Sequence, residues 1–138
     1  EIGVRLVGSE MCIRDSEALS QFGQEIDYIN AHGTSTPVGD IAEINAIQEV
    51  FNSQNPFLSS TKSLTGHSLG ATGAQEVIYS MIMMNKGFVS PSINVEAVVD
   101  EIGDINLVTE ENNHKINSFM SNSFGFGGTN ACLVFNKD

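Results

Sequence analysis

Residues 25–51 read EIDYINAHGTSTPVGDIAEINAIQEVF, and this stretch decides the fold class. Its first seven residues alternate and are rich in β-formers, which predicts a strand over residues 25–31. The polar loop HGTSTP follows, and Pro37 suits the first turn of a helix, where its missing N–H costs little. A helix is predicted over residues 37–51. Its apolar positions recur at helical spacing: Ile41, Ile44, Ile47 and Phe51.

The remainder of the chain predicts a second helix and four further strands. The helix covers residues 71–85 and ends at Gly87; it is apolar on most sides, which is typical of a buried helix. Small residues in and before its first turns allow another backbone to approach closely: Gly70, Ala71, Gly73 and Ala74. The strands are residues 57–60, 105–109, 115–121 and 131–136, with a tight turn GFGGTN between the last two. This order of elements predicts a layered α/β domain.

Composition excludes several classes of protein. The 138 residues include 17 acidic and six basic side chains, for a formal charge of −11, so a polyanion such as nucleic acid would be repelled. No apolar run approaches the roughly 18 residues of a membrane span. Two cysteines in a chain of this length do not form a disulfide scaffold. We therefore expect a cytoplasmic domain with an acidic surface.

Residues 1–16 differ from the sequence that follows. They contain both arginines, Arg5 and Arg14, and one of the two cysteines, Cys12. Residues 6–16, LVGSEMCIRDS, resemble the translation of a transposase-based sequencing adapter. We therefore assign residues 1–16 to an extraneous segment outside the fold, in which we expect no defined structure. The expected domain is residues 17–138, encoded by a truncated coding sequence.

Three polar motifs lie in loops beside the predicted elements, where α/β proteins place reactive groups. They are His32–Pro37 (HGTSTP), Lys62 with the following Gly66–Gly70 (GHSLG), and Asn122–Asn130 (NSFGFGGTN). GHSLG fits the G-x-S-x-G elbow of serine hydrolases and acyltransferases with Ser68 as nucleophile, but a loop precedes it where that elbow needs a strand. A metal site of His32 and His67 with Asp40 or Glu76 lacks any close ligand spacing. GFGGTN has no following helix that would make it a nucleotide loop.

The segments DYINAHGTSTPVGD, SSTKSLTGHSLGATGAQEVIYS and MSNSFGFGGTNACLVF resemble the C-terminal part of a β-ketoacyl-[acyl-carrier-protein] synthase. The likeness runs from about residue 25 to the end, with all three motifs in the family's order. Ser68 after Gly-His, and Gln75-Glu76, resemble the synthase I branch more than synthase II. The resemblance implies an α/β fold that is the C-terminal half of a thiolase-like, five-layer αβαβα arrangement.

The family resemblance also implies roles for individual residues. His32 and His67 match the two histidines that stabilise the enolate formed when malonyl-acyl carrier protein loses carbon dioxide. Lys62 and Glu43 match a lysine and the acid that pairs with it, and they are expected to set the surroundings of His67. The expected substrate-binding residues are two hydroxyls for the pantetheine arm and a gating phenylalanine: Thr34, Thr36 and Phe126.

A set of five residues matches a monovalent-cation site of the family: Asn30, Ala31, Glu76, Ser121 and Asn122. The alternative is that Glu76 hydrogen-bonds the loops. The resemblance implies no organic cofactor, an acyl carrier protein as partner, and a homodimer when the enzyme is whole. It also implies that the acyl-accepting cysteine lies in a missing N-terminal half, so that this fragment alone is inert.

The resemblance leaves other functions open. This protein could instead be a polyketide ketosynthase, a synthase II, or a non-catalytic chain-length-factor-like partner. The presence of both histidines favours an enzyme. A serine acyltransferase that uses Ser68 is the alternative from outside the family.

Overall fold

The computed structural model describes residues 4–125 and 127–137. The helices are α1 (Val4–Phe22), α2 (Pro37–Val50), α3 (Lys62–Thr65) and α4 (Thr72–Lys86), with short 3₁₀ helices η1 (Leu69–Ala71) and η2 (Asp100–Ile102). The strands are β1 (Tyr28–Asn30), β2 (Phe57–Ser59), β3 (Asn106–Leu107), β4 (Ser118–Phe124) and β5 (Asn130–Asn136). The predicted α/β class is confirmed.

The five strands form one mixed sheet in the order β3-β2-β1-β4-β5. Strand β1 pairs in parallel with both β2 and β4, and β2 pairs in parallel with β3, whereas β5 is antiparallel to β4. Ile29 in β1 therefore lies between Leu58 of β2 and Met120 of β4. All three side chains are buried, so the centre of the sheet is also the centre of the core.

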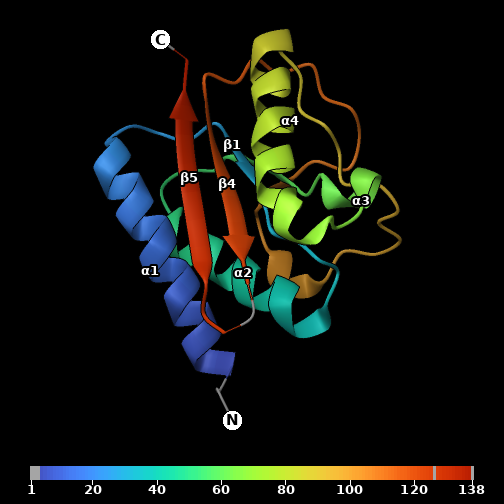
Figure 1. The fold of residues 1–138 in the computed structure, drawn as a ribbon. Helices are drawn as coiled ribbons and strands as arrows, with labels where there is room; N and C mark the ends of the chain where they lie inside the picture. Colours follow the sequence, from blue (N-terminus) through green and yellow to red (C-terminus); the bar gives the residue numbers. More distant parts are fainter. Residues whose placement is uncertain (1–3, 126, 138) are drawn as a thin grey trace.

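Successive residues of the strands point to opposite faces of the sheet, and each face has its own apolar cluster. Ile29 and Met120 pack on the side of α1 and α2, together with Ile47. Tyr28 and Phe119 point the other way and pack with Met83 of α4. The chain thus has three layers: α1 and α2, the sheet, and α4 (Figure 1).

Both predicted helices are confirmed, and their ends follow from local chemistry. Helix α2 begins at Pro37, after Thr36 with an extended backbone (φ −108°, ψ 130°). Helix α4 ends at Gly87, whose φ of 75° is left-handed and whose N–H donates to Met83 O at 2.8 Å. The small residue Gly73 lets α4 approach β4, because a Cβ there would lie 3.0 Å from Ser123 Oγ.

The turn between β4 and β5 is also confirmed. The N–H of Gly125 donates to Thr129 O at 2.8 Å, and Gly127 and Gly128 both have positive φ. These two glycines adopt backbone conformations that other residues rarely occupy.

The first predicted strand is shorter than expected. Residues 25–31 alternate in sequence, but the strand is limited to β1. The N–H groups of Ile26 and Asp27 donate to side chains, Gln54 Oε1 at 3.1 Å and Ser118 Oγ at 3.0 Å, and not to the backbone of a neighbouring strand. The last strands match closely, with β4 shifted by three residues toward the C-terminus and β5 extended by one at its start.

The expectation that the second helix is buried on most sides is wrong for the chain described. Helix α4 buries Met83 against the sheet, but Ile78, Met81 and Ile82 on its other side are 53, 38 and 47% exposed. Among the residues that the structure describes, no other helix covers this face (Figure 1). Among the described residues, no helix combines the length and apolar character that crossing a bilayer requires.

The expectation that residues 1–16 have no defined structure is wrong for residues 4–16, the part of this segment that the structure describes. Helix α1 begins at Val4 and continues without a break through Phe22. It lies beside α2 and β5 (Figure 1), with Met11 and Asp15 buried at 4 and 0% exposure. Met11 packs with Ala42 and Ala46 of α2 and with Phe124 of β4, so the segment buries apolar side chains against the domain. The adapter-like origin of residues 6–16 remains a hypothesis about the coding sequence.

Candidate active site

The three elements that carry the predicted catalytic residues converge at one edge of the sheet. His32 follows the carboxyl end of β1, and Lys62 follows the carboxyl end of the parallel strand β2. His67 lies in the loop that connects α3 with η1. Ligands of open α/β sheets bind outside these carboxyl ends, so these residues lie where such folds place their ligand sites.

The two histidines are neighbours in space although 35 positions separate them in sequence. Their ring centroids lie 5.7 Å apart and the ring planes are almost perpendicular, at 87°. An oxygen hydrogen-bonded to a ring nitrogen lies about 4 Å from that ring's centroid. By distance, one oxygen atom between His32 and His67 is therefore within hydrogen-bonding reach of both rings. Phe124 of β4 supports His32 from another side, with centroids 5.9 Å apart.

The hydrogen bonds of His67 determine which ring nitrogen carries its proton. The backbone N–H of Leu69 donates to Nδ1 at 3.1 Å, and the hydroxyl of Thr72 lies 2.9 Å from the same nitrogen. A backbone N–H is only a donor, so neutral His67 has its lone pair on Nδ1 and its proton on Nε2. Leu69 has a positive φ of 54°, the conformation that directs its N–H back to the ring. Sequence reasoning missed Thr72.

His32 is neutral at pH 7. Burial lowers the pKa of its imidazole to about 4, and the charges of Lys62 and His67 add to the effect. Its Nδ1 is buried and has no hydrogen-bond partner among the described residues. A neutral imidazole carries one N–H donor and one acceptor, so His32 can also donate to a substrate oxygen.

Glu43 holds the backbone on which His32 is mounted. Its carboxylate oxygens accept the N–H groups of His32 and Gly33, both at 2.8 Å. Burial raises the pKa of Glu43 to about 7, although these two hydrogen bonds oppose the effect. Gly33 has a φ of +32°, and a Cβ there would meet Ser60 Cβ at 2.8 Å, so only glycine fits this turn.

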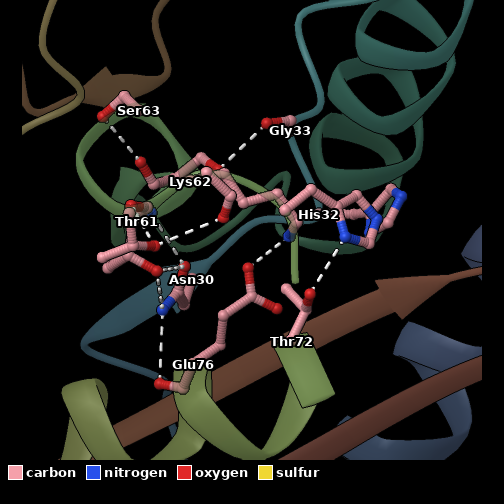
Figure 2. A network of polar contacts seen from close by, with 12 residues as sticks. Asn30, His32, Gly33, Thr61, Lys62, Ser63, Thr72 and Glu76 are labelled. Carbon is pink, nitrogen blue, oxygen red and sulfur yellow. Dashed lines mark hydrogen bonds and ion pairs between the residues drawn. The ribbon is translucent and has the colours of Figure 1, made fainter. Parts of the chain in front are cut away.

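The prediction that Lys62 pairs with Glu43 is wrong. The Lys62 ammonium forms a buried ion pair with Oε1 of Glu76 in α4 (Figure 2). Glu43 faces backbone N–H groups and Glu76 faces the ammonium, so each acid has a separate task. Burial raises the pKa of Glu76, while the hydrogen bond and charge of Lys62 act in the opposite direction. Sequence reasoning paired Lys62 with Glu43 and assigned Glu76 to a cation site or to hydrogen bonds with the loops.

Asn30 joins the surrounding elements into one rigid unit (Figure 2). Its amide Nδ2 donates to Thr61 Oγ1, to Ser80 Oγ at 3.1 Å and to the backbone O of Glu76, and its Oδ1 accepts the Thr61 N–H at 3.3 Å. The end of β1, the start of α3 and the middle of α4 are thereby connected. Sequence reasoning identified only two members of this network, Asn30 and Glu76.

A family model described as "Beta-ketoacyl synthase, C-terminal domain" matches residues 6–96, which is more than half of the chain. The chain belongs to the β-ketoacyl synthase family. The matched range begins inside the segment that resembles an adapter, in agreement with the helix that the structure has there.

The similar ketosynthases support the synthase I assignment. The chain is 56% identical over 112 residues to 3-oxoacyl-[acyl-carrier-protein] synthase 1 of Escherichia coli (strain K12), covering 81% of this chain and 28% of that protein. It is 51% identical over 131 residues to the synthase 1 of Haemophilus influenzae, covering 94% of this chain and 32% of that protein. The chain thus spans about a third of the length of the curated relatives it matches.

Solved ketosynthase structures have the same fold as this chain. A β-ketoacyl synthase from Burkholderia phymatum superposes with a TM-score of 0.88 at 35% identity, over 95% of this chain and 33% of that one. A structure titled as a type II PKS acyl-carrier protein in complex with its ketosynthase gives 0.88 at 29% identity, over the same shares. The thiolase-like fold class is therefore confirmed, and the three layers seen here are this chain's part of it.

The structure gives the serine-nucleophile alternative no support in this ketosynthase. Ser68 is exposed and lies between α3 and η1, in a loop without a preceding strand. The two cysteines are also unsuited, because burial raises the pKa of Cys12 to about 11 and raises that of Cys132 as well.

The predicted substrate-binding residues are placed in part. Thr34 and Thr36 lie in the loop after His32, with their hydroxyl oxygens 3.4 Å apart, and Thr36 is exposed. The Thr36 N–H donates to Asp40 Oδ1 at 3.4 Å. Phe126 lies outside the described residues.

The residues of the predicted cation site gather at the ends of two adjacent strands. Asn30 of β1 pairs in register with Ser121 of β4, and Ala31 and Asn122 are the next residues along. Two buried oxygens in this set have no hydrogen-bond partner, Glu76 Oε2 and Asn122 Oδ1. Across residues 4–125 and 127–137, His, Cys, Asp and Glu side chains form no group of three suited to a metal ion, which leaves the metal site considered for His32 and His67 unsupported.

Proposed function

We propose that this chain supplies the decarboxylating part of a β-ketoacyl-acyl carrier protein synthase of fatty acid elongation. The observation that carries the proposal is the pair of perpendicular imidazoles 5.7 Å apart, one of them with its proton directed to Nε2. Two imidazole N–H donors this close together suit a developing oxyanion. The sequence identity to two proteins named synthase 1 favours fatty acid synthesis over polyketide synthesis.

The reaction divides into bond changes that these residues can assist. The bond between the malonyl α-carbon and its carboxylate breaks, carbon dioxide leaves, and the electron pair moves toward the thioester carbonyl. The resulting enolate oxygen accepts hydrogen bonds from His32 and His67, each worth about 2.7–4 kcal/mol in the transition state. The enolate carbon then forms a bond to an acyl thioester carbonyl, and the thiolate of a cysteine supplied by another part of the whole enzyme leaves.

The neutral state of His32 is essential to this role. A protonated His32 would be repelled by the buried positive charge of Lys62. This repulsion is one reason why the pKa of His32 is lowered to about 4. His32 therefore carries a single N–H at working pH. It donates this N–H in a hydrogen bond and does not transfer the proton to the enolate. Lys62, held by Glu76, provides the fixed charge, and Glu43 holds the His32 backbone in position.

The remaining assignments are proposals of the same kind. Thr34 and Thr36 contact the pantetheine arm, and Phe126 gates the acyl site. The partner is an acyl carrier protein in the cytoplasm, and the whole enzyme is a homodimer. A ketosynthase structure of similar fold is titled as a complex with such a carrier, which supports the partner.

We also propose that a monovalent cation is held by oxygens of Asn30, Ala31, Ser121, Asn122 and Glu76. The two partnerless buried oxygens in this set fit an oxygen-preferring cation, because a buried acceptor without a donor is costly. When bound, the cation supplies positive charge beside Glu76 and organises the strand ends that support His32.

The test uses a hybrid in which residues 25–138 of this chain replace the matching segment of the Escherichia coli synthase 1. Release of carbon dioxide from malonyl-acyl carrier protein is measured for the hybrid and for three alanine variants. We expect His32→Ala and His67→Ala each to slow release by about 10²–10³. Ser68→Ala is the matched control in the same loop and should keep the rate.

Two results would contradict the proposal. Loss of activity in Ser68→Ala with an active His32→Ala variant would establish a serine acyltransferase, since loss of a true nucleophile costs on the order of 10⁶. A hybrid that takes up acyl groups but releases no carbon dioxide would indicate a non-catalytic partner of the chain-length-factor kind.

A further inference from the structure

Thr72 contacts His67, one of the two proposed catalytic histidines. It is the first residue of α4 and is only 5% exposed. Its Oγ1 lies 2.9 Å from Nδ1 of His67, which is the contact drawn from Thr72 in Figure 2. In the described part of the chain this is the side-chain hydrogen bond that satisfies the buried hydroxyl.

The direction of this hydrogen bond follows from the other partner of the same nitrogen. The Leu69 N–H already donates to Nδ1 at 3.1 Å, so Nδ1 is an acceptor and has no proton to give. The Thr72 hydroxyl must then donate, and Nδ1 receives two donors. Both withdraw electron density from the ring and make the opposite N–H a stronger donor.

Thr72 and Leu69 belong to parts of the chain that are connected to the core to different degrees. His67 lies in an exposed stretch, residues 64–71, and Leu69 belongs to the same stretch with 80% of its side chain exposed. Thr72 opens α4, which the Asn30 network and the Lys62–Glu76 ion pair connect to the core. The Thr72 hydroxyl is thus the contact that joins the His67 ring to the rigid part of the domain.

We propose that Thr72 is a positioning residue for His67: its hydroxyl donates to Nδ1, holds the ring in place, and keeps the proton on Nε2 where the malonyl thioester oxygen needs it. The proposal rests on the proposed function. It concerns the decarboxylation step and not the earlier transfer of the acyl group, because the proposed function has His67 donate to the malonyl thioester oxygen.

The experiment compares variants of Thr72 in the same hybrid enzyme. Thr72→Val removes the hydroxyl and keeps the shape, Thr72→Ser keeps the hydroxyl, and Thr109→Val makes the same change at an exposed site. One neutral hydrogen bond corresponds to about a 2- to 12-fold change in rate. We expect kcat for carbon dioxide release to fall by that factor in Thr72→Val, with KM for malonyl-acyl carrier protein and the rate of acyl transfer unchanged. Thr72→Ser should restore most of the loss, and Thr109→Val should have no effect.

A second measurement does not depend on turnover. With ¹⁵N-labelled histidine, the Nδ1 resonance of His67 should have the shift of an unprotonated, hydrogen-bonded nitrogen, and it should move toward that of a free acceptor in Thr72→Val. An unchanged resonance would overturn the proposal.

The kinetic outcomes separate this inference from the proposed function. Equal rates of carbon dioxide release in Thr72→Val and the unmodified hybrid would overturn the role of Thr72 and leave the proposed function standing. A parallel loss of acyl transfer, or a failure of Thr72→Ser to recover, would show that Thr72 is merely structural. An unmodified hybrid without carbon dioxide release would defeat the proposed function, and the resonance would then decide the contact.

Discussion

Replacing Asp15 with Asn should stabilise the chain at pH 8 and leave its stability nearly unchanged at pH 4. Asp15 lies in α1 with 0% exposure, and burial raises the pKa of its carboxyl from 3.8 to about 6. The Asn122 amide donates to its Oδ2 at 3.3 Å, but Asp15 Oδ1 and Asn122 Oδ1 are both buried acceptors without donors. An Asn at this position can donate to Asn122 Oδ1 and still accept from Asn122 Nδ2.

The magnitude follows from the shift in pKa. A tenfold change in proton affinity corresponds to about 1.4 kcal/mol, so the ionised form of Asp15 costs the folded state about 3 kcal/mol. The folded-state pKa of this acid is raised, so the cost is absent below pH 3.8, grows between pH 3.8 and about 6, and is complete above that. The substitution should therefore raise the free energy of unfolding by about 3 kcal/mol at pH 8.

The assay is equilibrium unfolding of the dilute chain in urea, followed by circular dichroism at both pH values. Asp104→Asn is the control, because it removes an exposed carboxylate and should change stability equally little at either pH. Equal stability of Asp15→Asn and the parent chain at pH 8 would refute the reasoning. It would mean that α1 is not docked and that residues 1–16 lie outside the fold after all.

Two further predictions concern the exposed helix face and the turn after β1. The chain should self-associate through α4, and Ile78→Lys combined with Ile82→Glu should lower its mass in sedimentation, because these side chains are 53 and 47% exposed; an unchanged mass would exclude this face. Gly33→Ala should cost about 1–3 kcal/mol more than Gly23→Ala. Both glycines have positive φ, but only at Gly33 does an added Cβ meet Ser60, so equal losses in urea unfolding would show that the turn is not tightly packed.

The motifs and the main elements could be predicted from the sequence. A strand, a polar loop with Pro37 and an amphipathic helix are local patterns, and local hydrogen bonding and side-chain spacing produce them wherever they occur. The same is true of the Gly87 helix end and the glycine-rich turn after β4. His32 and His67 could be chosen as candidates because each lies in such a loop.

The partners of the buried charges could not be predicted in the same way. Glu43 and Glu76 are both acids on helices near the site, and only the packing of α2 and α4 on opposite faces of the sheet assigns one to backbone N–H groups and the other to Lys62. Thr72 has no local signal either, because its contact with His67 depends on how the exposed loop folds back over the start of α4.

By itself, then, the sequence determined the α/β class, the order of its main strands and helices and the two histidines, because these depend on neighbours within a few positions along the chain. The tertiary structure alone decided that residues 4–22 form a docked helix and that one face of α4 stays exposed. It also decided that the ring centroids of the two imidazoles lie 5.7 Å apart. Those facts depend on which surfaces are brought together across the sheet, and burial sets both the free energy and the protonation of the groups placed there.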